Sequence, residues 1–107
     1  MARISAEAVQ QAVDRMKREF QPIAIYHFGS SSRGIDGPSS DIDLLVVVEK
    51  SDEPFFARTQ RAFSCLRGVE APVDVFVYTR EEFDQRAELP VSFERTVQNE
   101  GRIVYAA

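Results

Sequence analysis

Three aspartates stand in β-prone runs where folding alone gives no reason for a charge. Asp41 and Asp43 open the run DIDLLVVV, and Asp74 interrupts the run VDVFVY. Residues i and i+2 of a strand point to the same face, so Asp41 and Asp43 share one. An ionised carboxylate in such a run is costly to bury unless it is paired or binds a metal. If the two strands are neighbours, the three carboxylates converge, which is typical of a site for one or two Mg²⁺ ions.

The segment before these acids has the residues of a phosphate-binding loop. It reads GSSSRGIDGPSS and follows directly on an apolar run that ends at Phe28. Gly29 allows a sharp turn of the backbone, Ser30 offers a hydroxyl donor, and Arg33 offers a planar cationic fork for phosphate. A helical turn that begins at Ser30 would add backbone N–H groups. Hydrogen-bond donors for phosphate oxygens, placed beside a metal site, suit the binding of a nucleoside triphosphate.

Helices and strands are needed to hold these residues in place, and the sequence predicts both kinds. Apolar stripes, caps and β-branched runs indicate the elements, with Pro22 and Gly101 ending helices. The predicted order is helix 5–20, strand 23–28, loop 29–40, strand 41–48, helix 54–67, strand 73–78, a capped turn from 79, helix 91–100 and an edge strand 102–105. We therefore expect an α/β (α+β) fold in which a small mixed sheet is flanked by helices. The residues of the second helix that we expect to face inward are Phe55, Phe56, Ala62, Phe63 and Leu66. Any of its phenylalanines that is exposed could instead form a partner surface.

Composition excludes several classes of protein. The 107 residues predict one domain over 1–107, and the net charge of −4 argues against a simple electrostatic nucleic-acid binder. One cysteine and one histidine exclude an internal disulfide and a Cys/His zinc site within one chain. Any metal must then bind to oxygen ligands. No apolar run approaches the length of a membrane span, and the first ten residues lack a signal core. We expect a cytoplasmic protein.

Phe28-Gly29-Ser30, ten residues and then Asp41-Ile42-Asp43 resemble the G-S-x10-D-x-D signature of the DNA polymerase β-like nucleotidyltransferases. Asp74 resembles the third acid of that family. The short chain and its ending NEGRIVY resemble the minimal nucleotidyltransferase (MNT) group. The resemblance implies a nucleotidyltransferase fold and Mg²⁺-dependent transfer of a nucleoside monophosphate to a hydroxyl, with release of pyrophosphate.

The resemblance also implies a role for each site residue. Gly29 and Ser30 would hold the triphosphate, Asp41 and Asp43 would bind both metals, and Asp74 would bind the second metal and help activate the acceptor hydroxyl. The group often has Arg directly after the Gly-Ser pair, where this chain has Ser31. Arg33 is then the only cation of the loop, which predicts a weaker affinity for the triphosphate.

MNT proteins resemble the antitoxin half of two-component modules whose partner is a helical HEPN-type protein. By that resemblance we expect transfer of AMP from ATP to a tyrosine of such a partner. Two alternatives stay open. One is a small-molecule nucleotidyltransferase of the aminoglycoside type, and the other is an inactive module that neutralises its partner by binding. A self-assembled dimer is another source of the acceptor, and polymerisation on DNA or RNA is disfavoured by the acidic chain.

Overall fold

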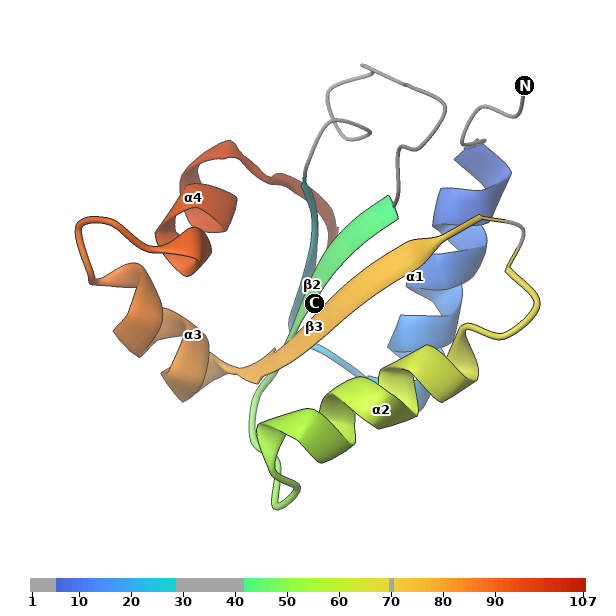
Figure 1. Ribbon diagram of the computed structural model, residues 1–107, viewed down its shortest axis with the longest axis horizontal. Coiled ribbons are helices and arrows are strands. Elements are labelled where there is room, and N and C mark those ends of the chain that lie inside the picture. The colour runs from blue at the N-terminus through green and yellow to red at the C-terminus, as the bar shows by residue number, and fades with distance from the viewer. Residues whose placement is uncertain (1–5, 29–41, 70) are drawn as a thin grey trace.

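A computed structural model describes residues 6–28, 42–69 and 71–107, and it has the predicted mixed α/β architecture (Figure 1). The elements are, in order, α1 (Ala6–Phe20), β1 (Ala24–Phe28), β2 (Ile42–Val48), α2 (Phe55–Cys65), β3 (Val73–Thr79), α3 (Arg80–Ala87), α4 (Phe93–Glu100) and β4 (Arg102–Ala106). The order and kinds of elements predicted from the sequence are confirmed, including the edge strand at the end. In the described residues no helix is long and apolar enough to cross a membrane.

The four strands form one mixed sheet in the order β3-β2-β1-β4. β1 is antiparallel to both β2 and β4, whereas β2 and β3 are parallel. The chain passes from β2 to β3 through α2, as a parallel connection requires a crossover. This arrangement brings the carboxyl end of β1 and the amino ends of β2 and β3 to the same edge of the sheet.

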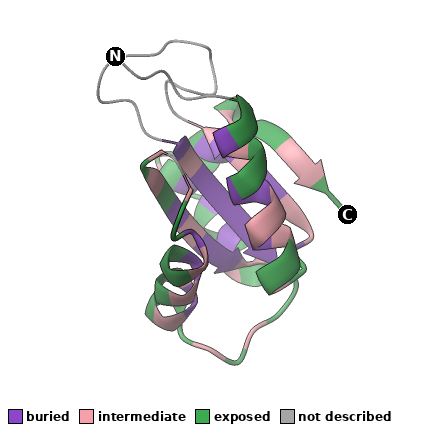
Figure 2. Cartoon of the chain, turned by 90° about the vertical axis from the view of Figure 1, so that its right-hand side faces the viewer, coloured by how far each residue is buried: buried purple, intermediate pink, exposed green. Residues whose placement is uncertain are grey.

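Each face of the sheet carries its own hydrophobic core. Helices α1 and α2 cover one face, where Met16, Ala62 and Leu66 pack against the strands. Helices α3 and α4 cover the other face through Phe83 and Val97. Figure 2 shows the buried residues concentrated in the central strands. Because both faces are covered, the whole of β2 is buried except one half-buried residue, Asp43.

Side-chain caps fix the helices α3 and α4. The predicted capping box at α3 is present: Thr79 Oγ1 accepts from the backbone N–H of Glu82, and Glu82 Oε1 accepts from the backbone N–H of Thr79. At α4, Ser92 Oγ accepts from the backbone N–H of Arg95 at 3.0 Å. These bonds satisfy backbone donors that a helix leaves free at its first turn.

The prediction for the inner face of α2 is confirmed for Ala62 and Leu66 and wrong for the three phenylalanines. Phe56 is 65% exposed and Phe63 46%, and Phe55 is 38% exposed, whereas Arg58 is buried with an exposure of 1%. The Arg58 Nη2 donates to both carboxylate oxygens of Glu82 at 2.9 Å. The carboxylate of the α3 capping box therefore pairs with an arginine that is buried where the sequence predicted only apolar side chains.

Arg58 is expected to depend on Glu82 for its burial. Its Nε and Nη1 are buried without a hydrogen-bond partner among the described residues, so Glu82→Ala leaves the guanidinium without its counter-charge. Because Glu82 is partly exposed, we expect a loss of about 2 kcal/mol in the free energy of unfolding, measured with urea. The neighbouring Glu81→Ala should cost less than about 0.5 kcal/mol.

The same measurement in an Arg58→Met background separates the two contributions of Glu82, its ion pair with Arg58 and its part in the helix cap. There Glu82→Ala should cost about 1 kcal/mol, which is the cap alone. Equal losses in the two backgrounds would contradict the dependence of Arg58 on Glu82.

His27, the one histidine of the chain, is buried in β1 with an exposure of 5%. Burial lowers the pKa of His27 below its ordinary value of 6.5, and the positive charge of Arg102 lowers this pKa further. The folded state therefore resists protonation of the imidazole, while the unfolded chain takes up a proton below pH 6.5.

It follows that the stability contributed by a neutral His27 is complete above pH 6.5 and is lost as the pH falls below it. The free energy of unfolding should fall between about pH 7.5 and about pH 5.5, by at most about 1.4 kcal/mol per pH unit. The fall should be smaller in His27→Gln. Urea unfolding at both pH values checks this, and an equal fall in the two proteins would assign the effect to other groups.

Candidate functional site

Asp43 and Asp74 lie side by side on neighbouring strands. They are register partners in the parallel pair of β2 and β3, and neighbouring strands lie about 4.8 Å apart. Asp43 is half-buried and Asp74 is exposed. The convergence that the sequence predicted for these two acids is thus present at the edge where β1 ends.

Both acids point to the face of the sheet that α3 and α4 cover. Asp43 alternates with Leu44 and shares a face with Leu45, and Asp74 shares a face with Phe76. The two helices cover only part of this face, which leaves Asp74 open to solvent. Since β3 is the outer strand of the sheet, Asp74 is the acid that a second molecule reaches from the side.

Aromatic side chains lie directly beside the acids. Phe28 is the cross-strand partner of Asp43, on the side opposite Asp74. Its ring contacts Phe93 edge-on, with 5.2 Å between ring centroids, and Phe76 contacts Phe93 in the same manner at 5.5 Å. The acids therefore lie at the end of an apolar surface made by two strands and the start of α4.

A buried hydrogen bond anchors α4 to the sheet. The Tyr78 hydroxyl donates to Glu94 Oε2 at 2.7 Å, and both side chains are buried. Burial raises the pKa of Tyr78 above its ordinary range, and the hydrogen bond to Glu94 raises it further. Tyr78 therefore stays a neutral donor, and this bond fixes the helix that carries Phe93.

The other predicted site residues lie outside the described residues. These are Asp41 and the predicted triphosphate ligands Gly29, Ser30 and Arg33. Of the described residues next to them in the sequence, Phe28 ends β1 and Ile42 begins β2, both at the acidic edge. The roles that the sequence suggested for the four residues stay predictions.

Asp43 and Asp74 suit a hard divalent cation by their chemistry. Mg²⁺ takes oxygen ligands and is usually bound through one or two carboxylates, with water and substrate phosphates completing its shell. No group of three metal-ligating side chains occurs among residues 6–28, 42–69 and 71–107. The described part of the chain thus provides two adjacent carboxylates, which is the number that a substrate-bridged Mg²⁺ site needs from a protein.

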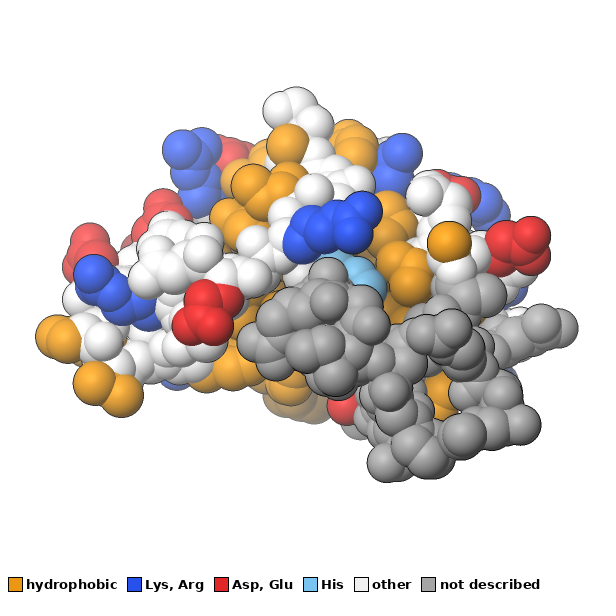
Figure 3. Space-filling view, turned by 90° about the horizontal axis from the view of Figure 1, so that it is seen from above, with side chains coloured by type: hydrophobic (Ala, Val, Ile, Leu, Met, Phe, Trp, Pro, Cys, Tyr) orange, Lys and Arg blue, Asp and Glu red, His pale blue; other side chains and the backbone are white. Residues whose placement is uncertain are grey.

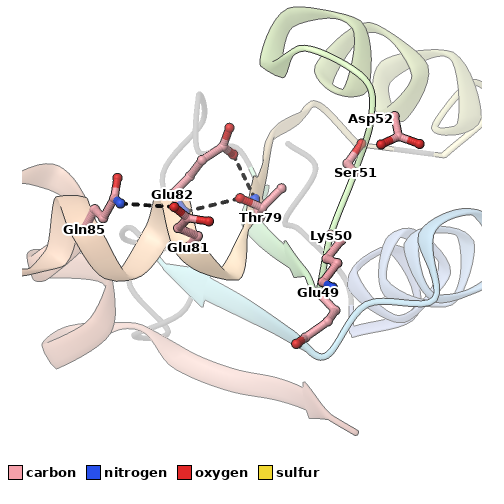
Figure 4. A pocket seen from close by; sticks show the side chains of 8 residues that line it. All are labelled: Glu49, Lys50, Ser51, Asp52, Thr79, Glu81, Glu82 and Gln85. Carbon is pink, nitrogen blue, oxygen red and sulfur yellow. Dashed lines mark hydrogen bonds between the residues drawn. The ribbon is translucent and has the colours of Figure 1, made fainter.

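A second acidic hollow lies at the opposite end of the same strands. It has a volume of 480 Å³ and is lined by Glu49, Lys50, Ser51, Asp52, Thr79, Glu81, Glu82 and Gln85 (Figure 4). Glu82 is bound by Arg58 and by the α3 cap, and Glu81 accepts from Gln85. These carboxylates are engaged in local structure, so the hollow is a weaker candidate than the Asp43–Asp74 edge.

Sequence reasoning missed the position of Phe93 at this site. The apolar pattern of the last helix does not indicate that Phe93 is 43% exposed and contacts Phe28 of β1 and Phe76 of β3. One signal was available, because Ser92 is a strong N-cap residue and places Phe93 at the first position of the helix.

Comparison with known proteins agrees with this geometry. The model of a family described as "Nucleotidyltransferase domain" matches residues 9–105. A solved structure, described as a "putative nucleotidyltransferase" from Sulfolobus solfataricus, is 28% identical to this chain with a TM-score of 0.57. The match covers 74% of this chain and 70% of that one. No curated protein matches the chain.

The adjacent acids predict that Mg²⁺ stabilises the fold. At a concentration about ten times its Kd, Mg²⁺ should raise the free energy of unfolding by about 1.4 kcal/mol. Asp43→Asn should abolish this response. The matched control Asp84→Asn, at an exposed position on α3, should retain it. Urea unfolding with and without Mg²⁺ checks both, and a full response in Asp43→Asn would place the cation elsewhere.

Proposed function

Because this chain belongs to the nucleotidyltransferase domain family, we propose that it is a Mg²⁺-dependent adenylyltransferase that transfers AMP from ATP to a tyrosine of a helical HEPN-type partner and thereby acts as an antitoxin. The observation that carries the catalytic part is the side-by-side placement of Asp43 and Asp74 at an open sheet edge. The nature of the partner rests on the resemblance of the sequence to MNT proteins.

Asp43 and Asp74, with Asp41, would hold the metal. Bound Mg²⁺ would supply charge stabilisation at the triphosphate and lower the pKa of an acceptor hydroxyl. The half-buried Asp43 is the more fixed ligand, because cores on both faces hold β2. Asp74 is exposed on the outer strand, where it meets both the nucleotide and an incoming acceptor.

In the proposed transfer, the phenol oxygen of the acceptor attacks the α-phosphorus of ATP. A bond forms between that oxygen and the α-phosphorus, and the bond from the α-phosphorus to the oxygen that bridges to the β-phosphate breaks. Pyrophosphate leaves, and the phenol proton passes to Asp74 and then to solvent. The product is a phosphodiester between tyrosine and AMP.

A macromolecular acceptor is favoured by exposed apolar side chains on the loop that leads to Phe93. The loop from α3 to α4 exposes Leu89 at 55% and Val91 at 95%, and it leads directly to Phe93. Figure 3, which views the molecule from above, shows hydrophobic side chains at the surface of this face. Exposed apolar groups of this kind are typical of protein contacts, whereas a small polar acceptor would not bury them.

Label transfer tests the proposal. Purified protein is incubated with Mg²⁺ and ATP in a lysate of the source cell, with ³²P on either the α- or the γ-phosphate. We expect the α-label, but not the γ-label, to enter one protein band at a tyrosine. Asp74→Asn should reduce this transfer at least about a hundredfold, while Asp84→Asn should not change it.

Each other outcome identifies a different function. Label in a small molecule would replace the tyrosine acceptor by a soluble hydroxyl compound. Transfer of the γ-label would indicate phosphorylation. If no label transfers and Asp43→Asn still neutralises the toxicity of the partner, the protein is a binding module and the proposed activity is wrong.

A further inference from the structure

The Phe93 ring is partly exposed at the start of α4. It is the first residue of α4, and 43% of it is exposed although its neighbours Phe28 and Phe76 are partly buried. A ligand that covers the exposed part of this ring gains the free energy of burying its apolar surface. The residues around the ring indicate the chemical class of that ligand.

Several contacts hold the ring of Phe93 in one place. Phe28 and Phe76 both meet it edge-on, at interplanar angles of 74° and 68°. The cap at Ser92 fixes the first turn of the helix, and the bond from Tyr78 to Glu94 ties the next residue to β3. A ring held in this way keeps its exposed part available for a flat partner and loses little entropy on binding.

The ring contacts a near neighbour of each acid. Phe28 is the register partner of Asp43, and Phe76 follows Asp74 by two positions on the same face. A base is separated from the α-phosphate of its nucleotide by a single sugar. If the phosphates are bound at Asp43 and Asp74, the base therefore reaches Phe93 without crossing the rest of the protein.

We propose that the exposed ring of Phe93 is the stacking surface for the base of the bound nucleoside triphosphate. This inference rests on the proposed function, because it takes the phosphates to lie at the acidic edge. Stacking on one ring tolerates any base, since every base has a π-face. Phe93 then contributes affinity for nucleotides without selecting among them.

Binding measurements with two ligands test this role. In the presence of Mg²⁺, calorimetry gives the Kd of ATP and of inorganic tripolyphosphate for wild type, Phe93→Leu, Phe93→Tyr and the control Phe56→Leu. Tripolyphosphate carries the charge of ATP but no base. We expect Phe93→Leu to weaken ATP binding about tenfold and to leave tripolyphosphate binding unchanged.

The variants separate base stacking from an effect on the phosphate site. Phe93→Tyr retains a ring and should bind ATP as wild type does, and Phe56→Leu changes an exposed phenylalanine on the far helix α2 without effect. An unchanged ATP affinity in Phe93→Leu would overturn the inference and leave the proposed function standing. An equal loss for both ligands would also overturn it, because the residue would then act on the phosphate site. If wild type binds neither ligand, the proposed function itself fails.

Discussion

The free-energy cost of burying a charge governs the layout of this domain. β2 is covered on both faces, and a carboxylate deeper in it would lose its solvation without compensation. Asp43 therefore lies at the amino end of the strand, where α3 and α4 no longer cover the sheet. Asp74 occupies the matching position of β3. The two charges therefore lie as neighbours at an open edge, an arrangement that suits a divalent cation held between them.

Two other pairs of polar side chains join the layers of the domain. Arg58 and Glu82 link α2 to α3, and Tyr78 and Glu94 link β3 to α4. Each pair spans elements that share little apolar surface, so directional bonds fix their relative placement. In consequence α4, though only eight residues long, presents Phe93 at a defined position beside the acids.

Much of this could be predicted from the sequence, since periodicity and caps report on local energetics. The run DIDLLVVV and the pair Thr79 and Glu82 indicated a buried strand and a capping box, and both are present. The prediction for the inner face of α2 was wrong for its phenylalanines. The burial of Arg58 depends on a carboxylate 24 positions away, and no local sequence pattern reveals that contact. The location of Phe93 was missed for the same reason: its neighbours come from two strands far away in the chain.

The pairing of β1 with β4 has a consequence for how the chain folds. Ile25 is the register partner of Tyr105, eighty positions later in the sequence, whereas the partners within β1 and β2 are far closer. Contacts between distant residues form slowly, because the entropy of a long loop is lost before the contact forms. The strands that bear the acidic pair can therefore associate first, and β4 closes the sheet as a late step.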